Sequence, residues 1–181
     1  MARHPPGARG DVIPSAPLIV TAELPADLQA WANALRRAHY PPERNQLHAH
    51  VTLFHALPPS SEDELRGVLA TAAREHAPVP ARLEGVMSLG GGTALRLSSP
   101  EMLALRREVA ARLHGLLGAQ DEGEPRLHVT VQNKVFSKEA KALQAQLAGE
   151  MTPRDFRFAG LALHRYLGGP WEPLKRWSFR G

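Results

Sequence analysis

The tripeptide His-Val-Thr occurs twice in this chain, and both copies lie in segments whose alternate residues are apolar. The first copy is His50–Thr52 within LHAHVTLF (47–54), and the second is His128–Thr130 within RLHVTVQNK (126–134). Alternate side chains of a β-strand point to the same face. Each segment therefore predicts a strand with one apolar face and one polar face, the latter centred on a histidine and a threonine. The fold must bury one side of each strand and leave the other side open.

The elements around the two tripeptides follow the same order. From Leu18 the sequence predicts a strand, a helix, a His-Val-Thr strand and a helix, and from Thr93 it predicts the same series. His50 lies 32 residues after Leu18, and His128 lies 35 residues after Thr93. This spacing indicates an internal repeat of one supersecondary unit. We therefore expect a pseudo-twofold arrangement in which the two His-Val-Thr strands face one cleft.

Apolar periodicity and turn signals predict the remaining elements. The expected strands are 18–24, 47–54, 81–89, 93–98, 126–135, 156–163 and 176–179, and the expected helices are 27–38, 61–72, 99–118 and 137–149. Gly90-Gly91-Gly92 predicts a hairpin turn. Ser61, Ser99 and Ser137 are expected to cap the helices that follow them, Ser61 as part of a capping box.

Length and composition limit the class of protein. A chain of 181 residues suits one domain. We expect residues 1–16, which are rich in proline and glycine, to be a flexible leader, and residues 17–181 to be a single bilobal domain. No apolar run approaches the roughly 18 residues that a membrane-spanning helix needs. The absence of cysteine excludes disulfides, zinc–thiolate sites and thiol catalysis, and it fits a cytoplasmic protein.

The positive charge is concentrated at one end of the sequence. The formal net charge is +4, and residues 152–181 hold six basic against two acidic residues. Such a segment could attract an anionic partner, of which RNA is an obvious candidate. On charge alone, a solvated basic surface explains it equally well.

A histidine and a threonine repeated on two strands suit phosphoryl transfer. Because imidazole titrates near neutral pH, one histidine can take a proton from water while the other gives one to the leaving oxygen. A threonine hydroxyl can donate a hydrogen bond to a non-bridging phosphate oxygen. The polar faces of the two strands and the basic and aromatic segment 164–171 add possible substrate-binding residues: His48, Phe54, Arg126, Gln132, Lys134, Arg165 and Tyr166.

A metal site is the competing interpretation of the first strand. His48 and His50 lie on one face and could bind a metal together with His128. Neither strand carries an acidic residue on its polar face, and a metal site would leave the two threonines without a purpose. We therefore expect neither a metal nor a cofactor.

The two tripeptides resemble the paired His-x-Thr motifs of the 2H phosphoesterase superfamily, and within it the bacterial 2′-5′ RNA ligase-like branch. The likeness covers about residues 17–181 through element order and motif placement. It implies an α+β fold that is bilobal and pseudo-twofold, with antiparallel sheets lining a central cleft and helices packed outside. It also implies that His50 and His128 are the catalytic pair and that Thr52 and Thr130 bind the phosphate.

The resemblance further implies a metal-independent phosphodiesterase that acts on the 2′,3′-cyclic phosphate ends of RNA or on small cyclic nucleotides and gives 2′-phosphates. We also expect a monomer that does not bind membranes. Two alternatives stay open: a 2′-5′ RNA ligase or reversible transesterase, and a non-catalytic module that binds RNA ends. We expect His128 to be the general base and His50 the general acid, with the reverse assignment left open.

Overall fold

The structure is a computed structural model, and it describes residues 16–181. Its strands are β1 (Leu18–Glu23), β2 (Val51–Leu57), β3 (Val79–Ser88), β4 (Thr93–Ser98), β5 (His128–Gln132), β6 (Arg154–Phe158), β7 (Gly160–Tyr166) and β8 (Trp171–Ser178). Its α-helices are α1 (Ala26–His39), α2 (Glu62–Glu75), α3 (Pro100–Arg112), α4 (Ala119–Glu122) and α5 (Ser137–Glu150). No helix in this part of the chain is long and apolar enough to cross a membrane.

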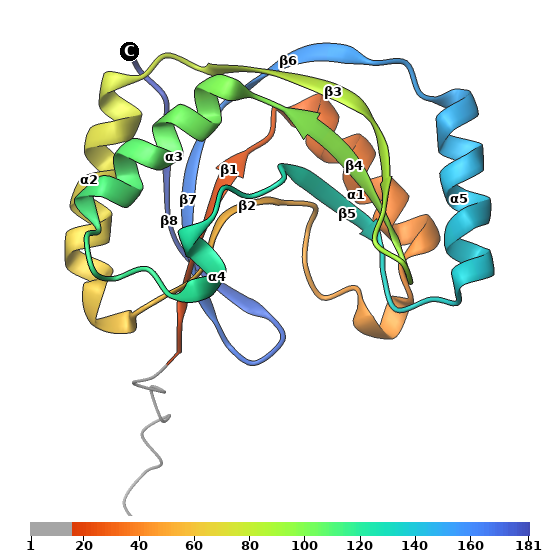
Figure 1. Ribbon diagram of the computed structural model, residues 1–181, viewed down its shortest axis with the longest axis horizontal. Coiled ribbons are helices and arrows are strands. Elements are labelled where there is room, and N and C mark those ends of the chain that lie inside the picture. The colour runs from red at the N-terminus through yellow and green to blue at the C-terminus, as the bar shows by residue number, and fades with distance from the viewer. Residues whose placement is uncertain (1–15) are drawn as a thin grey trace, which may run out of the picture.

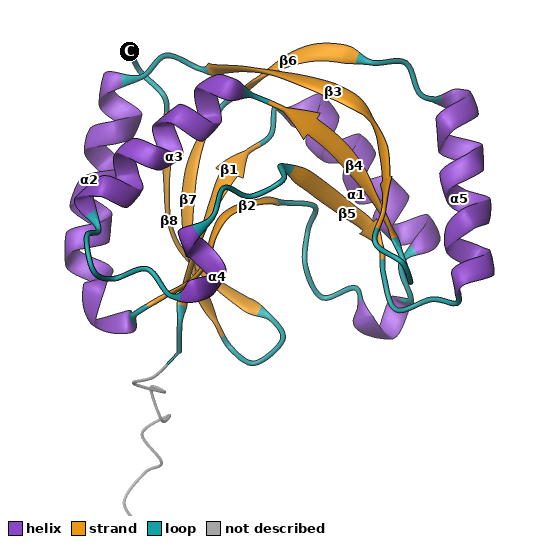
Figure 2. Cartoon of the chain, viewed as in Figure 1, coloured by secondary structure: helices purple, strands orange, loops and turns teal. Residues whose placement is uncertain are grey.

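The strands form two antiparallel sheets of four. The first sheet has the order β2-β1-β7-β8, and the second has the order β5-β4-β3-β6. Both sheets lie between the helices, with α2 and α3 on one flank and α1 and α5 on the other (Figures 1 and 2). The strands that carry the tripeptides, β2 and β5, are edge strands of different sheets and contact each other. This architecture confirms the expected α+β fold.

The order of elements repeats as the sequence predicts. The first repeat unit is β1–α1–β2–α2 and the second is β4–α3–β5–α5, with the short α4 inserted before β5. The helix after the first strand of a unit reaches the tripeptide strand of the other unit. Helix α1 packs on β5, and α3 reaches β2 through a hydrogen bond of Arg106. The two units are therefore interlocked.

A single hydrophobic cluster joins the two sheets. It includes Val20 and Leu53 from the first sheet and Leu95 and Val129 from the second, all at most 1% exposed. Each such side chain contributes about 1.5–3 kcal/mol relative to an exposed one. The apolar faces of the two tripeptide strands are thus fixed by the core, which leaves their other faces free for function.

Strand β2 begins later than the sequence predicts. The expected strand starts at residue 47, whereas β2 starts at Val51 and His50 immediately precedes it. The backbone of Ala49 is instead bound by side chains of α1: Asn33 Oδ1 accepts from Ala49 N at 2.7 Å, and Gln29 Nε2 donates to Ala49 O at 2.8 Å. Because these backbone groups are satisfied by α1, the segment leading to His50 does not need a neighbouring strand.

The expected strand 156–163 is two strands in different sheets. Residues up to Phe158 belong to β6 in the second sheet, and residues from Gly160 belong to β7 in the first. A Cβ atom at position 160 would collide with the carbonyl oxygen of Trp177 on β8. Within this apolar run the chain passes from the second sheet to the first. Glycine is needed at position 160 because the backbone of β8 comes close to it there.

The hairpin between β3 and β4 is confirmed. Leu89 N donates to Gly92 O at 2.9 Å, and Gly90 has a φ of 79°, which favours glycine. A Cβ atom at position 92 would collide with the carbonyl oxygen of Gln132 on β5. The turn thus lets the second sheet close tightly against the end of the second tripeptide strand.

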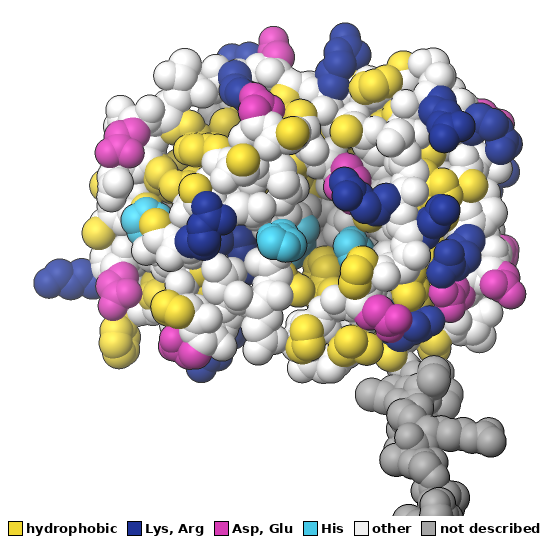
Figure 3. Space-filling view, turned by 180° about the vertical axis from the view of Figure 1, so that it is seen from behind, with side chains coloured by type: hydrophobic (Ala, Val, Ile, Leu, Met, Phe, Trp, Pro, Cys, Tyr) yellow, Lys and Arg dark blue, Asp and Glu magenta, His cyan; other side chains and the backbone are white. Residues whose placement is uncertain are grey.

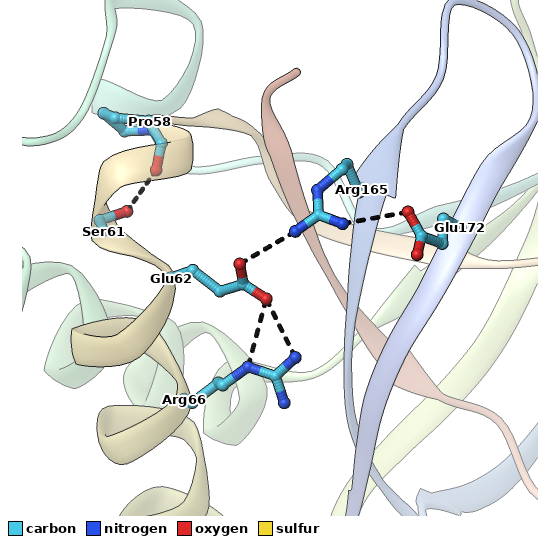
Figure 4. A network of polar contacts seen from close by, with 6 residues as sticks. All are labelled: Pro58, Ser61, Glu62, Arg66, Arg165 and Glu172. Atoms are coloured by element: carbon cyan, nitrogen blue, oxygen red, sulfur yellow. Dashed lines mark hydrogen bonds and ion pairs between the residues drawn. The ribbon is translucent and has the colours of Figure 1, made fainter. Parts of the chain in front are cut away.

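The helix caps divide into confirmed and wrong predictions. Ser99 Oγ accepts from Met102 N at 3.0 Å and caps α3 as expected. Ser61 Oγ instead donates to Pro58 O at 2.6 Å, so the predicted capping box is absent from α2 (Figure 4). Ser137 is the first residue of α5, where no side-chain cap is present.

Of the expected leader, residues 1–15 lie outside the described part of the chain, while Ala16 is buried.

Candidate functional site

The two histidines are held in the same way. His50 Nδ1 lies 2.8 Å from the carbonyl oxygen of His48, and His128 Nδ1 lies 2.6 Å from the carbonyl oxygen of Arg126. A carbonyl oxygen can only accept, so the hydrogen sits on Nδ1 in both rings. In the neutral form each Nε2 therefore carries a lone pair that can take a proton. The two imidazole rings therefore have the same tautomer, and in each the Nδ1 atom faces the carbonyl oxygen two residues earlier.

The two threonines lie two residues after the histidines. Thr52 and Thr130 are both half-buried, whereas the residues between the members of each pair, Val51 and Val129, are in the core. Alternation along each strand therefore puts histidine and threonine on the same face, away from the core. Two rings and two hydroxyls are thus available at the facing edges of the two sheets.

A cavity of about 750 Å³ opens beside His50. Its walls come from β1, α1, the segment before β2 and the β7–β8 pair, and include Thr21, Asn33, His48, His50, His164 and Trp171. The ring of Trp171 lies 4.5 Å from that of His50 and 5.3 Å from that of His164. Thr21 Oγ1 and His164 Nε2 are 3.0 Å apart. The cavity therefore offers an aromatic wall and several polar groups next to one tripeptide histidine.

His50 is partly accessible to solvent but densely surrounded by protein. The pKa of His50 is lowered from 6.5 to about 4, mainly by burial and to a smaller extent by the positive charges of Arg36, His164 and His128. The hydrogen bond to the His48 carbonyl acts in the opposite direction. Burial also lowers the pKa of His164, followed by the charge of Arg176. The lowered pKa keeps His50 neutral near pH 7, so the lone pair of Nε2 carries no proton.

Comparison with known proteins identifies the family. The profile of the 2′-5′ RNA ligase superfamily matches residues 24–170. The chain belongs to this superfamily. Its match covers both tripeptides and confirms the resemblance to the 2H phosphoesterases. Membership supports a phosphodiesterase-type enzyme.

Solved structures share the fold of this superfamily member. TT0787 of Thermus thermophilus matches with a TM-score of 0.64 and 20% identity, covering 91% of this chain and 98% of TT0787. Escherichia coli LigT complexed with 3′-AMP matches with a TM-score of 0.61 and 16% identity, covering 92% and 99%. LigT complexed with phosphate gives 0.55 and 18%, covering 91% and 97%. A comparison with curated protein sequences finds no match.

Two residues expected on the polar faces are buried instead. Phe54 is fully buried beneath the guanidinium of Arg106, whose Cζ lies 4.4 Å from the ring centroid. The pairing of β2 with β1 shifts register next to Phe54, so strict alternation ends after Thr52. Gln132 is 4% exposed, and its Oε1 accepts from Thr93 Oγ1 at 2.9 Å. Neither side chain is free to contact a substrate, which corrects both predictions.

Arg165 belongs to an ion-pair network near the start of α2. Its guanidinium lies 2.9 Å from Glu62 and 3.0 Å from Glu172, and Glu62 also pairs with Arg66 (Figure 4). Because alternate residues of β7 point to opposite faces, His164 rather than Arg165 lines the cavity. Arg165 is therefore held in ion pairs outside the lining of this cavity, and a contact with substrate stays a prediction.

The other candidate residues are exposed. His48 lines the cavity through an exposed side chain, and Arg126, Lys134 and Tyr166 are also exposed. Their roles stay predictions. Within residues 16–181, no group of three or more His, Cys, Asp or Glu side chains has the arrangement of a metal site.

The basic end of the chain is partly neutralised. Three of its six basic residues form ion pairs, in which Arg154 meets Asp27, Arg165 meets Glu62 and Glu172, and Arg176 meets Glu23. On the face opposite that of Figure 1, basic side chains are scattered among acidic ones, and histidines lie near the middle (Figure 3). The concentration of charge seen in the sequence thus becomes a mixed surface.

His164 and Trp171 line the cavity. Both lie in the basic and aromatic segment 164–171, of which only Arg165 and Tyr166 were predicted as substrate-binding residues. One feature could have favoured His164: it lies on the face of its strand opposite that of Arg165.

Proposed function

We propose that this protein is a metal-independent phosphodiesterase that hydrolyses 2′,3′-cyclic phosphate ends of RNA or small cyclic nucleotides to 2′-phosphates. The observation that carries the proposal is the matching pair of histidines, each with Nδ1 bound to the carbonyl two residues earlier and Nε2 left for chemistry. A group that only gripped phosphate would not need two rings in this tautomer, because lysine or arginine would serve better.

The acid and base roles follow from the surroundings of His50. Because its pKa is about 4, neutral His50 accepts a proton from water at Nε2 as the water oxygen forms a bond to phosphorus. The bond from phosphorus to O3′ breaks, and protonated His128 donates its Nε2 proton to O3′. The products are a 2′-phosphate and a free 3′-hydroxyl. This reverses the assignment of base and acid favoured by the sequence alone.

Thr52 and Thr130 complete the proposed phosphate site. Their hydroxyls donate hydrogen bonds to the non-bridging oxygens, which gain charge in the transition state. The buried guanidinium of Arg36, close enough to lower the pKa of His50, adds positive potential to the same region. An anionic phosphate is therefore favoured between the two strands without a metal ion.

The cavity beside His50 is proposed to hold the nucleoside. Trp171 offers an aromatic face for stacking, and His164 offers a ring nitrogen near Thr21. A volume of about 750 Å³ lies within the range of 300–1,000 Å³ usual for small-molecule sites. The LigT structure with 3′-AMP shows that a protein of this fold binds a nucleotide.

Product analysis in a chelator tests the proposal. The protein is incubated in EDTA with 2′,3′-cyclic mononucleotides and with oligoribonucleotides that end in a cyclic phosphate, and 3′,5′-cyclic nucleotides serve as controls. We expect 2′-phosphates from the first two and no product from the third. A 3′-phosphate product, or activity that EDTA removes and a divalent ion restores, would contradict the mechanism.

A ligase activity is the second candidate, because the matched family is named for 2′-5′ RNA ligation. The same base can take the proton from a 5′-hydroxyl of RNA in place of water. The hydroxyl oxygen then bonds to phosphorus as O3′ leaves with the proton of the acid, which gives a 2′-5′ linkage and a free 3′-hydroxyl. Adding an oligonucleotide with a 5′-hydroxyl to the same incubation would reveal it as a longer product with a 2′-5′ linkage. Binding of cyclic ends with no product would indicate a non-catalytic module.

Cytoplasmic location and a monomeric state stay predictions.

A further inference from the structure

A buried arginine of α1 joins the two halves of the site. Arg36 is only 3% exposed. Its Nη1 donates to the carbonyl oxygen of Thr130 on β5 at 2.7 Å, and its Nε donates to Asn45 Oδ1 at 3.1 Å. Asn45 lies in the segment that leads to His50. One guanidinium therefore binds the second tripeptide strand and the approach to the first tripeptide.

A buried arginine of α3 makes the corresponding connection from the other repeat unit. Arg106 is 4% exposed. Its Nε donates to the carbonyl oxygen of Leu53 on β2 at 2.7 Å, and its Nη2 donates to the carbonyl oxygen of Asp121 at 2.7 Å. Asp121 lies in α4, in the segment that leads to His128. Its carboxylate accepts from the backbone N–H groups of His55 and Ala56 on β2 at 2.7 and 2.9 Å.

The two connections match across the repeat. Each arginine comes from the helix after the first strand of its unit, binds a carbonyl of the other unit's tripeptide strand, and holds the segment before its own unit's tripeptide. Each guanidinium also lies over an aromatic ring, Arg36 over Tyr40 at 4.3 Å and Arg106 over Phe54 at 4.4 Å. The equivalence extends beyond the tripeptides to the groups that support them.

Stability alone does not explain two buried arginines. Within residues 16–181, neither forms an ion pair with a carboxylate. Hydrogen bonds and an aromatic neighbour compensate each buried charge, and for Arg106 the more distant negative charges of Asp121 and Glu124 contribute as well. Burial lowers the pKa of both groups, which reflects the cost of removing the charge from water. The rigid, planar guanidinium can bind two separate segments at a fixed distance, and a lysine cannot.

We propose that Arg36 and Arg106 are positioning residues, each of which fixes one tripeptide strand relative to the approach to the other tripeptide and so sets the separation of the two histidines. The proposal rests on the proposed phosphodiesterase function, since it concerns the same site. Misplacement of a catalytic group by about 1 Å can lower a rate by about 10²-fold. Neither arginine is assigned a contact with substrate.

Arg36→Lys separates position from charge. The lysine keeps the positive charge near His50 but cannot bind Thr130 and Asn45 together. We expect kcat for 2′,3′-cyclic nucleotide hydrolysis to fall about 10- to 100-fold, and KM to rise by about tenfold at most, because the same displacement weakens the hold on the phosphate. Asn45→Ala, which removes one arm at a half-buried position, should give a smaller loss in the same direction. Arg106→Lys should resemble Arg36→Lys.

Leu69→Ala is the matched control. Leu69 is a fully buried residue of α2, and its truncation destabilises the protein without removing a hydrogen bond to either tripeptide strand. It should lower the melting temperature and leave kcat unchanged at a temperature where the protein is folded. Wild-type kcat in Arg36→Lys would overturn the proposal, because charge alone would then suffice. If Arg36→Lys does not fold, wild-type kcat in Asn45→Ala would overturn it instead.

Binding of inorganic phosphate gives a readout that does not depend on activity. In wild type, phosphate should shift the NMR signals of the His50 and His128 rings with one common Kd, and Arg36→Lys should weaken that Kd about tenfold. An unchanged Kd in the variant would overturn the positioning role. A wild-type protein that binds phosphate in this way but hydrolyses no cyclic phosphate would instead refute the proposed function and leave the positioning role supported.

Discussion

His50 and His128 occupy matching places in the two repeat units, but their surroundings differ. His50 lies against Trp171 and near His164, and its pKa falls to about 4. Among residues 16–181 no aromatic ring lies against His128 in this way. His164 comes from β7 and Trp171 from β8, and both strands follow the second repeat unit. The repeat thus supplies two equal chemical groups, and strands outside the repeat give them unequal surroundings, as the proposed roles of base and acid require.

Removing each histidine tests this difference most strongly. His50→Ala and His128→Ala should each lower kcat by about 10²- to 10⁴-fold, the usual contribution of a positioned acid or base. The wild-type profile of kcat/KM against pH should have an acidic limb near pH 4, because that limb reports His50 in the free enzyme. His50→Ala should abolish the acidic limb, whereas His128→Ala should abolish the alkaline limb. The opposite pattern would restore His128 as the base.

The dependence of stability on pH tests the environment of His50 without a substrate. Its pKa is about 4 in the folded protein and about 6.5 in the unfolded chain. Between these values the unfolded chain binds more protons, so the free energy of unfolding is highest above pH 6.5 and falls as the pH drops towards 4. The loss from this group should reach about 3 kcal/mol. Urea unfolding at several pH values gives the free energy of unfolding of wild type and of His50→Asn. Between pH 6.5 and 4 this free energy should fall more steeply for wild type. Equal slopes in the two proteins would contradict the lowered pKa of His50.

The two threonines should be more alike than the two histidines. Thr52→Val and Thr130→Val keep the β-branched shape that a strand favours and remove a hydrogen bond to charged phosphate. Such a bond contributes about 1.5–3 kcal/mol, so kcat/KM should fall roughly 10- to 150-fold in each variant. Both pH limbs should remain. A loss in one variant that exceeds the other by more than tenfold would show that the phosphate is held mainly by one unit.

Much of this site could be predicted because strand alternation and a repeated tripeptide are local patterns. The errors arise where segments distant in the sequence determine whether a side chain is buried or exposed. Phe54 follows a register shift set by β1, and Gln132 is bound by Thr93 from the neighbouring strand. Arg36 and Arg106 were missed as well, although a signal exists: Arg36 continues the buried stripe of Leu28 and Ala32 at four-residue spacing. A basic residue on the apolar face of a helix therefore indicates a buried charge that must find its hydrogen-bond acceptors elsewhere in the fold.

The smallest effect is expected at the starts of α3 and α2, where serine substitutions should change the free energy of unfolding by different amounts. Ser99→Ala removes both the cap hydrogen bond from Met102 N and the bond that Ser99 Oγ donates to Pro80 O, and should destabilise the protein by about 1–2 kcal/mol. Ser61→Ala, at a helix start without a side-chain cap, should cost less, and only through its bond to Pro58 O. Thermal or urea unfolding measures both. Equal losses would mean that the two serines support their helices to the same extent.

The pairing of β1 with β7 affects how the protein is made. β1 lies in the middle of the first sheet, between β2 and β7, and its partner β7 begins 137 residues after β1 ends. While the chain emerges from the ribosome, one edge of β1 stays without its partner until residues 160–166 have been made, and Trp171 is made later still. Contacts so far apart in sequence slow folding and expose strand edges to aggregation. Strands β3, β4 and β5 of the second sheet all precede residue 133, so the His128 side of the site is expected to form before the wall of the His50 side.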